Sequence, residues 1–80
     1  MWILDEEGNA INVSKASFIG VKRANNKYKV YAIFVEDNRT ELTLRYFDSL
    51  SSAKEAIKAL KELLNGEQSD EPKLGYAFTW

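Results

Sequence analysis

The 80-residue sequence contains neither histidine nor cysteine. Histidine is the side chain whose ordinary pKa lies closest to neutrality, and cysteine is the most readily activated nucleophile. Both residues also dominate zinc and copper sites. Their absence excludes catalytic triads, Cys–His dyads, zinc fingers and CxxC redox centres. We therefore expect a protein that acts by binding and not as an enzyme, without a metal ion or a cofactor.

Other signatures of a chemical site are also missing. The lone glycines Gly20 and Gly75 belong to no GxGxxG or GxxxxGK[ST] loop that would cradle a phosphate. The carboxylates fall in expected turns, at strand ends and on the outer side of an expected helix, so no acid–base pair stands out. The acidic run 5–7 lacks the spaced ligands of a calcium loop, and we interpret it as a solvated turn.

No apolar run approaches the roughly 18 residues that a membrane span requires. The chain turns acidic at Asp5, which is the opposite of the basic start of a secretory signal. The lack of cysteine suits a reducing compartment. These features predict a soluble, cytoplasmic protein that makes no membrane contact.

The charge is unevenly distributed along a chain of ordinary globular composition. Hydrophobic residues make up 45% and charged residues 29%, which fits one small folded domain. The formal net charge is only −1, yet residues 14–35 carry five lysines and arginines and no acidic residue. A local basic patch is therefore expected inside a chain that is close to neutral.

Alternating apolar and polar residues predict two groups of strands. The first is a short hairpin, in which 2–4 and 10–13 pair across the turn 5–9. The second is an antiparallel meander with tight turns around 25–26 and 37–40. Its strands are expected at 17–23, 27–36 and 41–47.

The two later strands of the meander differ in how their apolar residues alternate. Segment 27–36 is apolar on both faces, so we expect cover on both sides: the helix on one side, and the hairpin, the C-terminal segment or a second subunit on the other. One face carries Tyr28, Val30, Ala32 and Phe34, and the other carries Tyr31, Ile33 and Val35. In 41–47, simple alternation places Leu42, Leu44 and Tyr46 inward and Thr43 and Arg45 outward.

Segment 49–65 has the period of an amphipathic helix. Ser49 is the expected N-cap, a capping box of Ser52 and Glu55 is the alternative, and Gly66 is the expected stop. The apolar stripe consists of Ala53, Ala56, Ile57, Leu60, Leu63 and Leu64. The predicted fold is α+β, a curved antiparallel sheet of four to five strands with this helix packed on it. Residues 1–66 are assigned to one domain.

Residues 67–80 form a polar linker that is followed by an aromatic segment. In 73–80 large apolar residues alternate with small or polar ones, which is typical of a strand. Such a strand adds to its own sheet or to the sheet of another molecule, as in a swapped dimer. Aromatic residues are frequent in cores and at binding hot spots. The candidate protein interface therefore comprises Trp2, Tyr31, Ile33, Val35, Tyr76, Phe78 and Trp80.

The basic segment offers a second candidate site. Cations mixed with exposed aromatic rings bind single-stranded nucleic acid through backbone attraction and base stacking. The candidate residues are Lys22, Arg23, Lys27, Lys29 and Tyr31. The alternative is a solvated hairpin tip whose lysines protect a sheet edge from aggregation, and the acidic pI of about 5.4 favours that interpretation.

The order of these segments resembles a group of short, mostly uncharacterised proteins of Gram-positive bacteria and their phages. The segments concerned are Met1-Trp2-Ile3-Leu4, Ile11-Asn12-Val13, 28–35, Phe47-Asp48-Ser49 and 53–64. The resemblance covers residues 1–66 and implies an α+β fold in a small bacterial or phage-encoded protein. It implies no activity and no site residues.

Two hypotheses of function follow from the sequence. The first is a protein-interaction module, either a homo-oligomer such as a homodimer or an inhibitor or adaptor of a protein partner. The alternative is a binder of nucleic acid or of a signalling nucleotide through the basic hairpin 22–31.

Overall fold

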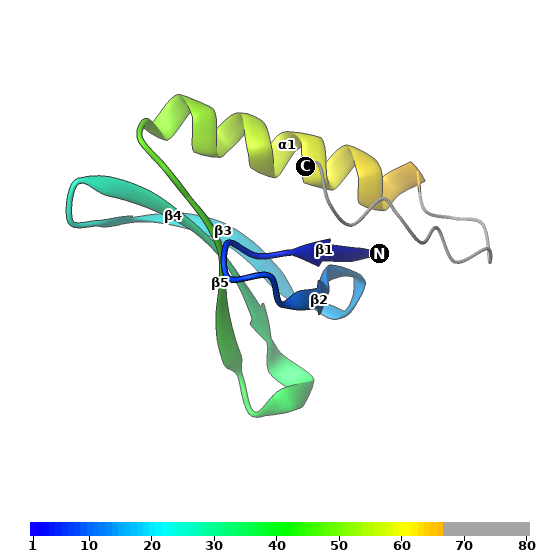
Figure 1. Ribbon diagram of the computed structural model, residues 1–80. Coiled ribbons are helices and arrows are strands. Elements are labelled where there is room, and N and C mark those ends of the chain that lie inside the picture. Colours follow the sequence, from blue (N-terminus) through cyan, green and yellow to red (C-terminus); the bar gives the residue numbers. More distant parts are fainter. Residues whose placement is uncertain (67–80) are drawn as a thin grey trace.

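The computed structural model describes residues 1–66. It consists of two groups of strands followed by one long helix (Figure 1). In chain order the elements are β1 (Trp2–Leu4), β2 (Ala10–Asn12), the 3-10 turn η1 (Val13–Lys15), β3 (Phe18–Ala24), β4 (Lys27–Phe34), the 3-10 turn η2 (Val35–Asp37), β5 (Thr40–Phe47) and α1 (Leu50–Gly66). The α+β class is therefore confirmed. The predicted strand within 73–80 lies outside the described residues.

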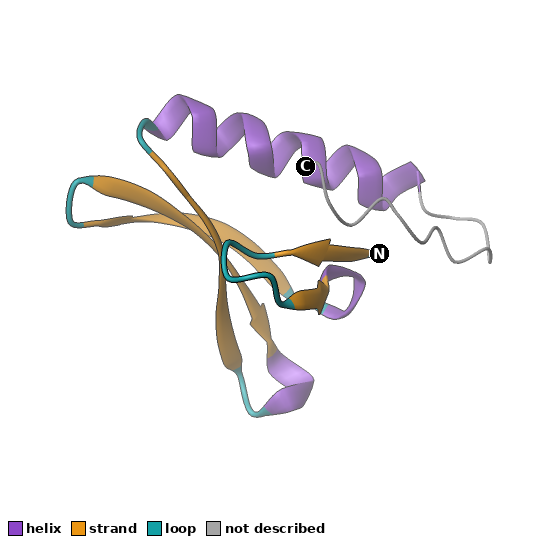
Figure 2. Ribbon diagram, in the orientation of Figure 1, coloured by secondary structure: helices purple, strands orange, loops and turns teal. Residues whose placement is uncertain are grey.

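The strands divide between two antiparallel sheets, which corrects the expected single sheet of four to five strands. β1 pairs with β2, and β3, β4 and β5 form a separate sheet in that order, twisted but not strongly curled (Figure 2). The separation has a local cause in η1. The Asn12 side chain accepts a hydrogen bond from the Ser14 N–H at 3.2 Å and caps η1, so the chain leaves the extended conformation before it reaches β3.

The acidic turn between β1 and β2 is organised by Asp5. The Asp5 carboxylate accepts hydrogen bonds from the Asn9 N–H at 2.7 Å and from the Glu7 N–H at 3.0 Å. These backbone donors, that of Asn9 above all, hold the pKa of Asp5 below its ordinary value, because they stabilise the ionised form. Gly8 supplies the positive φ of 85° that the turn requires.

A β-bulge interrupts the pairing of β4 with β5 and overturns part of the expected alternation. Val30 pairs with Arg45 while the next residue, Tyr31, pairs with Thr43, so Leu44 is the extra residue. An extra residue shifts every later side chain to the other face of the strand. Leu44 is buried. Tyr46 pairs with Lys29 on the face away from α1, whereas simple alternation predicted that Tyr46 would point inward.

The helix begins where the serine cap predicts. The Ser49 hydroxyl accepts a hydrogen bond from the Ser52 N–H at 3.2 Å, so Ser49 is the N-cap and α1 starts at Leu50. One residue of the predicted stripe is misplaced, since Leu63 is 42% exposed. The buried stripe of α1 is narrower than the apolar stripe in its sequence, because the helix contacts the sheet along one line only.

One core joins all of these elements. α1 and the β1–β2 hairpin pack on the same face of the three-stranded sheet, the face that carries Val30 and Ala32 (Figure 1). The buried residues are Ile3, Ile11, Val13, Val30, Ala32, Leu44, Ala53 and Leu60. The expectation that β4 is covered on both faces is therefore not met within residues 1–66, and the second face stays open.

Candidate functional site

We call the side of the β3–β4–β5 sheet opposite α1 the open face. The strand register assigns to it Phe18, Gly20 and Lys22 from β3, Lys27, Lys29, Tyr31 and Ile33 from β4, and Glu41, Thr43 and Tyr46 from β5. Within residues 1–66, α1 and the strands of the hairpin pack on the other face, and the acidic turn 5–9 borders this surface only at the β5 edge. The open face is therefore the main candidate for a binding surface.

Aromatic rings lie across the centre of the open face. Phe18 is 52% exposed and Tyr46 is 39% exposed, and the Phe18 and Tyr31 ring centroids are 5.9 Å apart with planes tilted by 41°. Gly20 makes this arrangement possible. A Cβ atom at Gly20 would lie 2.5 Å from Cε1 of Phe18 and 3.2 Å from the Tyr31 hydroxyl oxygen. Only a residue without a side chain leaves both rings room to lie against the strand.

A carboxylate joins two lysines beside these rings. Lys22 and Lys29 are directly opposite each other on β3 and β4, an arrangement that repels like charges. Glu41 on β5 relieves the repulsion: its Oε2 lies 2.9 Å from the Lys22 Nζ and 3.3 Å from the Lys29 Nζ. The Lys22 hydrogen bond, followed by that of Lys29, holds the pKa of Glu41 below its ordinary value.

Lys22 also contacts the central ring. Its Nζ lies 4.6 Å from the centroid of the Tyr31 ring, within the range of a cation–π interaction. The open face therefore combines a ring that already holds a cation with two exposed rings on either side. This arrangement suits contact with a flat or apolar group that carries a negative charge.

The structure brings together most of the predicted basic residues. Lys22, Lys27, Lys29 and Tyr31 belong to the open face. Lys27 forms an ion pair of 3.3 Å with Asp48. Arg23 pairs with Tyr28 on the opposite face, and its Nε donates to the Asn25 carbonyl at 3.4 Å, so it does not join the others.

The predicted protein interface is divided by the fold. Tyr31 and Ile33 lie on the open face. Trp2 is exposed on the separate hairpin, and Val35 is exposed in η2 beyond the end of β4. The remaining members, Tyr76, Phe78 and Trp80, lie outside the described residues.

Five residues of the open face were not predicted as site residues: Phe18, Gly20, Glu41, Thr43 and Tyr46. The alternation of β3 carried a usable signal for Phe18, since it shares a side with Lys22. No sequence signal marks Tyr46, because the bulge at Leu44 turns it over. The position of Glu41 depends on the pairing register of β4 with β5.

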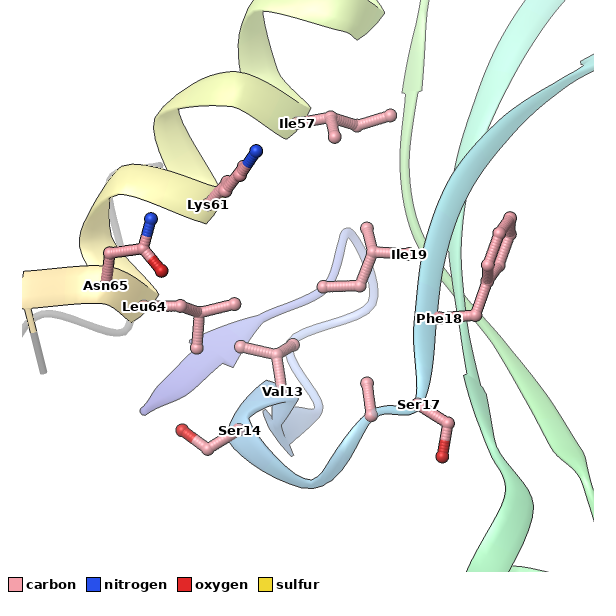
Figure 3. A pocket seen from close by; sticks show the side chains of 10 residues that line it. Val13, Ser14, Ser17, Phe18, Ile19, Ile57, Lys61, Leu64 and Asn65 are labelled. Carbon is pink, nitrogen blue, oxygen red and sulfur yellow. The ribbon is translucent and has the colours of Figure 1, made fainter.

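A second concave surface lies at the other end of β3 and belongs to the α1 side of the sheet. It is a groove of about 460 Å³ between α1, η1 and the start of β3. In Figure 3 Ile19 points into this groove while Phe18 points to the other side of the strand. The lining residues are Val13, Ser14, Ala16, Ser17, Phe18, Ile19, Ile57, Lys61, Leu64 and Asn65.

Comparison with protein-family models, with curated proteins and with solved structures finds no match to this chain. Among residues 1–66, no group of three or more acidic side chains is placed to hold a metal ion. In the same part of the chain, α1 lacks the combined length and apolar character that crossing a bilayer would demand.

Proposed function

We propose that this chain is a non-catalytic protein-binding domain whose open face is the contact surface. The observation that carries the proposal is the row formed by Phe18, Tyr31 and Tyr46 on a sheet face that α1 and the hairpin leave uncovered. Aromatic residues supply a large part of the binding energy in protein interfaces. A sheet face that carries them without cover favours association with another surface.

The charges of the open face describe the partner that it fits. Three lysines, Lys22, Lys27 and Lys29, stand against the paired carboxylates of Glu41 and Asp48. A third carboxylate, that of Glu6, lies at the β5 edge and lines one surface with Lys27 and Tyr46, so the face carries little net charge. Lys22 is the more accessible of the Glu41-bound pair, with 46% of its side chain exposed against 17% for Lys29. The expected partner is a protein surface with an apolar centre and an acidic side chain opposite Lys22.

A photoreactive amino acid tests this proposal in the full-length chain. Incorporated in place of Phe18 or Tyr46, it should give the same crosslinked protein in cells that produce this chain. Incorporated in place of Leu63, which is exposed on α1, it should not give that product. Crosslinks that do not differ between the open face and Leu63 would overturn the proposal.

Binding measurements with the purified partner complete the test. We expect Phe18→Ser and Lys22→Glu each to weaken binding about tenfold or more, which corresponds to about 1.4 kcal/mol. Leu63→Ser should leave the affinity unchanged. A mass that rises with concentration, and falls back in Phe18→Ser, would identify the partner as a second copy of this chain.

A nucleic acid or nucleotide is the second candidate ligand of the same face. The cation–π pair of Lys22 and Tyr31 favours it, because stacked bases and phosphates use rings and cations together. Three carboxylates stand against the three lysines, however, and so little net positive charge predicts a shallow salt dependence and therefore weak binding. Titration with an oligothymidine at two salt concentrations separates the candidates. Tight binding that depends steeply on salt and is lost in Tyr31→Ala would identify nucleic acid, and not a protein, as the ligand of the open face.

A further inference from the structure

The outer edge of β3 is unpaired among the described residues. The Tyr46 N–H points away from β4, because it donates to Glu6. In an antiparallel sheet the backbone groups of successive residues point alternately to the two sides. Lys29, which pairs with Tyr46, therefore turns its backbone groups towards Lys22 on β3. The outer edge of β3 is then formed by the backbone groups of Ile19, Val21 and Arg23.

The start of this free edge, at Ile19, borders the groove between α1, η1 and β3. The side chains of Val13, Ile19, Ile57 and Leu64 face the groove and make it mainly apolar (Figure 3). An unpaired strand edge beside an apolar groove matches the needs of an added strand, which supplies hydrogen bonds through its backbone and apolar side chains to one face.

We propose that residues 73–80 of the same chain bind in this place as a fourth strand, parallel to β3. Their sequence fits the groove, because every second residue is large and apolar: Leu74, Tyr76, Phe78 and Trp80. In this arrangement the row lies on the α1 side of the added strand, with Leu74 and Tyr76 nearest the groove and Phe78 and Trp80 farther along β3. The smaller residues between them, Gly75, Ala77 and Thr79, lie on the side of the open face. The inference is independent of the partner proposed for the open face.

The path of the chain favours an occupant from the same molecule. α1 ends at Gly66, directly after Leu64 and Asn65, which line the groove together with Ser17 at the start of β3. The six residues 67–72 reach at most about 20 Å. The eight residues 73–80 extend over about 26 Å as a strand, which is enough to follow the seven residues of β3, about 23 Å long.

The direction of the added strand follows from the topology. β3 and β5 run the same way, because each is antiparallel to β4. α1 runs back from the end of β5 to the start of β3, where Ser17 and Asn65 line the same groove. A segment that continues from there along β3 is therefore parallel to β5 and completes a β–α–β unit.

The hand of this unit agrees with the rule for such connections. For an L-residue in an upward strand whose side chain faces the viewer, the backbone N–H points to the right. Tyr46 lies on the open face and its N–H points away from β4, so β4 and β3 lie to the left of an upward β5 in that view. Seen from the α1 side, β4 and β3 therefore lie to the right of the upward β5. A strand beyond β3 then forms a right-handed crossover, the hand of nearly all β–α–β units.

Trp80 provides a direct readout in the full-length chain. The only other tryptophan is Trp2, so Trp2→Phe leaves Trp80 as the single fluorescent reporter. We expect emission at short wavelength and protection from acrylamide, both independent of protein concentration. In this background Leu64→Ala removes a groove side chain from the place where the added strand begins, so the strand should detach, the Trp80 emission should move to longer wavelength and quenching should rise. The neighbouring exposed Leu63→Ala should change neither.

Amide exchange supplies a second measurement that does not rely on a groove variant. In the otherwise unmodified chain the Ile19, Val21 and Arg23 amides should exchange slowly, and Phe78→Asp should speed their exchange while the amides of β4 stay protected. Rapid exchange at these three amides, or a solvent-exposed Trp80 at every concentration, would overturn the proposal. Protection that appears only at high concentration would also overturn it, because the occupant would then be a second copy.

Discussion

The backbone N–H of Tyr46 donates a hydrogen bond of 3.1 Å to the side-chain carboxylate of Glu6, forty residues earlier in the chain. Glu6 belongs to the turn between β1 and β2, and Tyr46 lies on β5, whose outer edge is unpaired among the described residues. The contact anchors the N-terminal turn against that edge. A charged side chain at an edge strand also opposes pairing with another molecule.

Removal of this carboxylate should open the edge of β5. We expect Glu6→Ala to speed amide hydrogen exchange at Tyr46, because the N–H loses its acceptor, and to increase self-association at high concentration. Glu7→Ala, in the same turn, is the matched control and should leave Tyr46 unchanged. Equal exchange in both variants would show that Glu6 does not protect the edge in solution.

Two leucines of β5 that simple alternation treats alike differ in burial. Leu44 is 1% exposed and Leu42 is 37% exposed. We expect Leu44→Ala to lower the free energy of unfolding by about 2–5 kcal/mol, the range for a buried leucine, and Leu42→Ala to cost about 1 kcal/mol or less. Urea denaturation monitored by circular dichroism measures both. Similar costs for the two variants would contradict the difference in burial described for these two side chains.

Glu41 should contribute to the acid sensitivity of the fold. Its pKa is lowered in the folded chain, mainly by the Lys22 hydrogen bond. Its contribution to stability is therefore complete above its unfolded pKa, and it is lost as the pH falls through the lower folded pKa. Glu41→Gln should reduce the fall in melting temperature between neutral and acidic pH. If the melting temperature falls by the same amount in Glu41→Gln and in the parent chain, Glu41 does not have this role.

Gly20→Ala should disturb the aromatic row without unfolding the domain. A methyl group at this position meets the Phe18 ring at its outer edge, and the exposed ring is able to swing away. We expect the stability to change by no more than about 1 kcal/mol, while the NMR signals of the Tyr31 ring shift because the Phe18 ring has moved. Phe18→Leu serves as the reference for complete loss of the ring. Tyr31 signals identical to those of the parent chain would contradict the close packing at Gly20.

The sequence by itself determined the local elements of this protein. The amphipathic period of 49–65 and the cap at Ser49 predicted α1 to within one residue at each end. The alternation in β3 and β4 correctly separated their two faces, and the turn residues located the connections. These features depend on neighbours only a few positions away, so a local pattern is sufficient to predict them.

Only the tertiary structure decided which surfaces are joined and which remain open. Packing placed the β1–β2 hairpin beside α1, so the other face of the sheet stayed uncovered in residues 1–66. Pairing across strands brought Glu41 between Lys22 and Lys29, and the bulge at Leu44 turned Tyr46 onto the open face. Each of these outcomes depends on register between distant segments. A shift of one residue exchanges the two faces of a strand, and no pattern within the strand itself records such a shift.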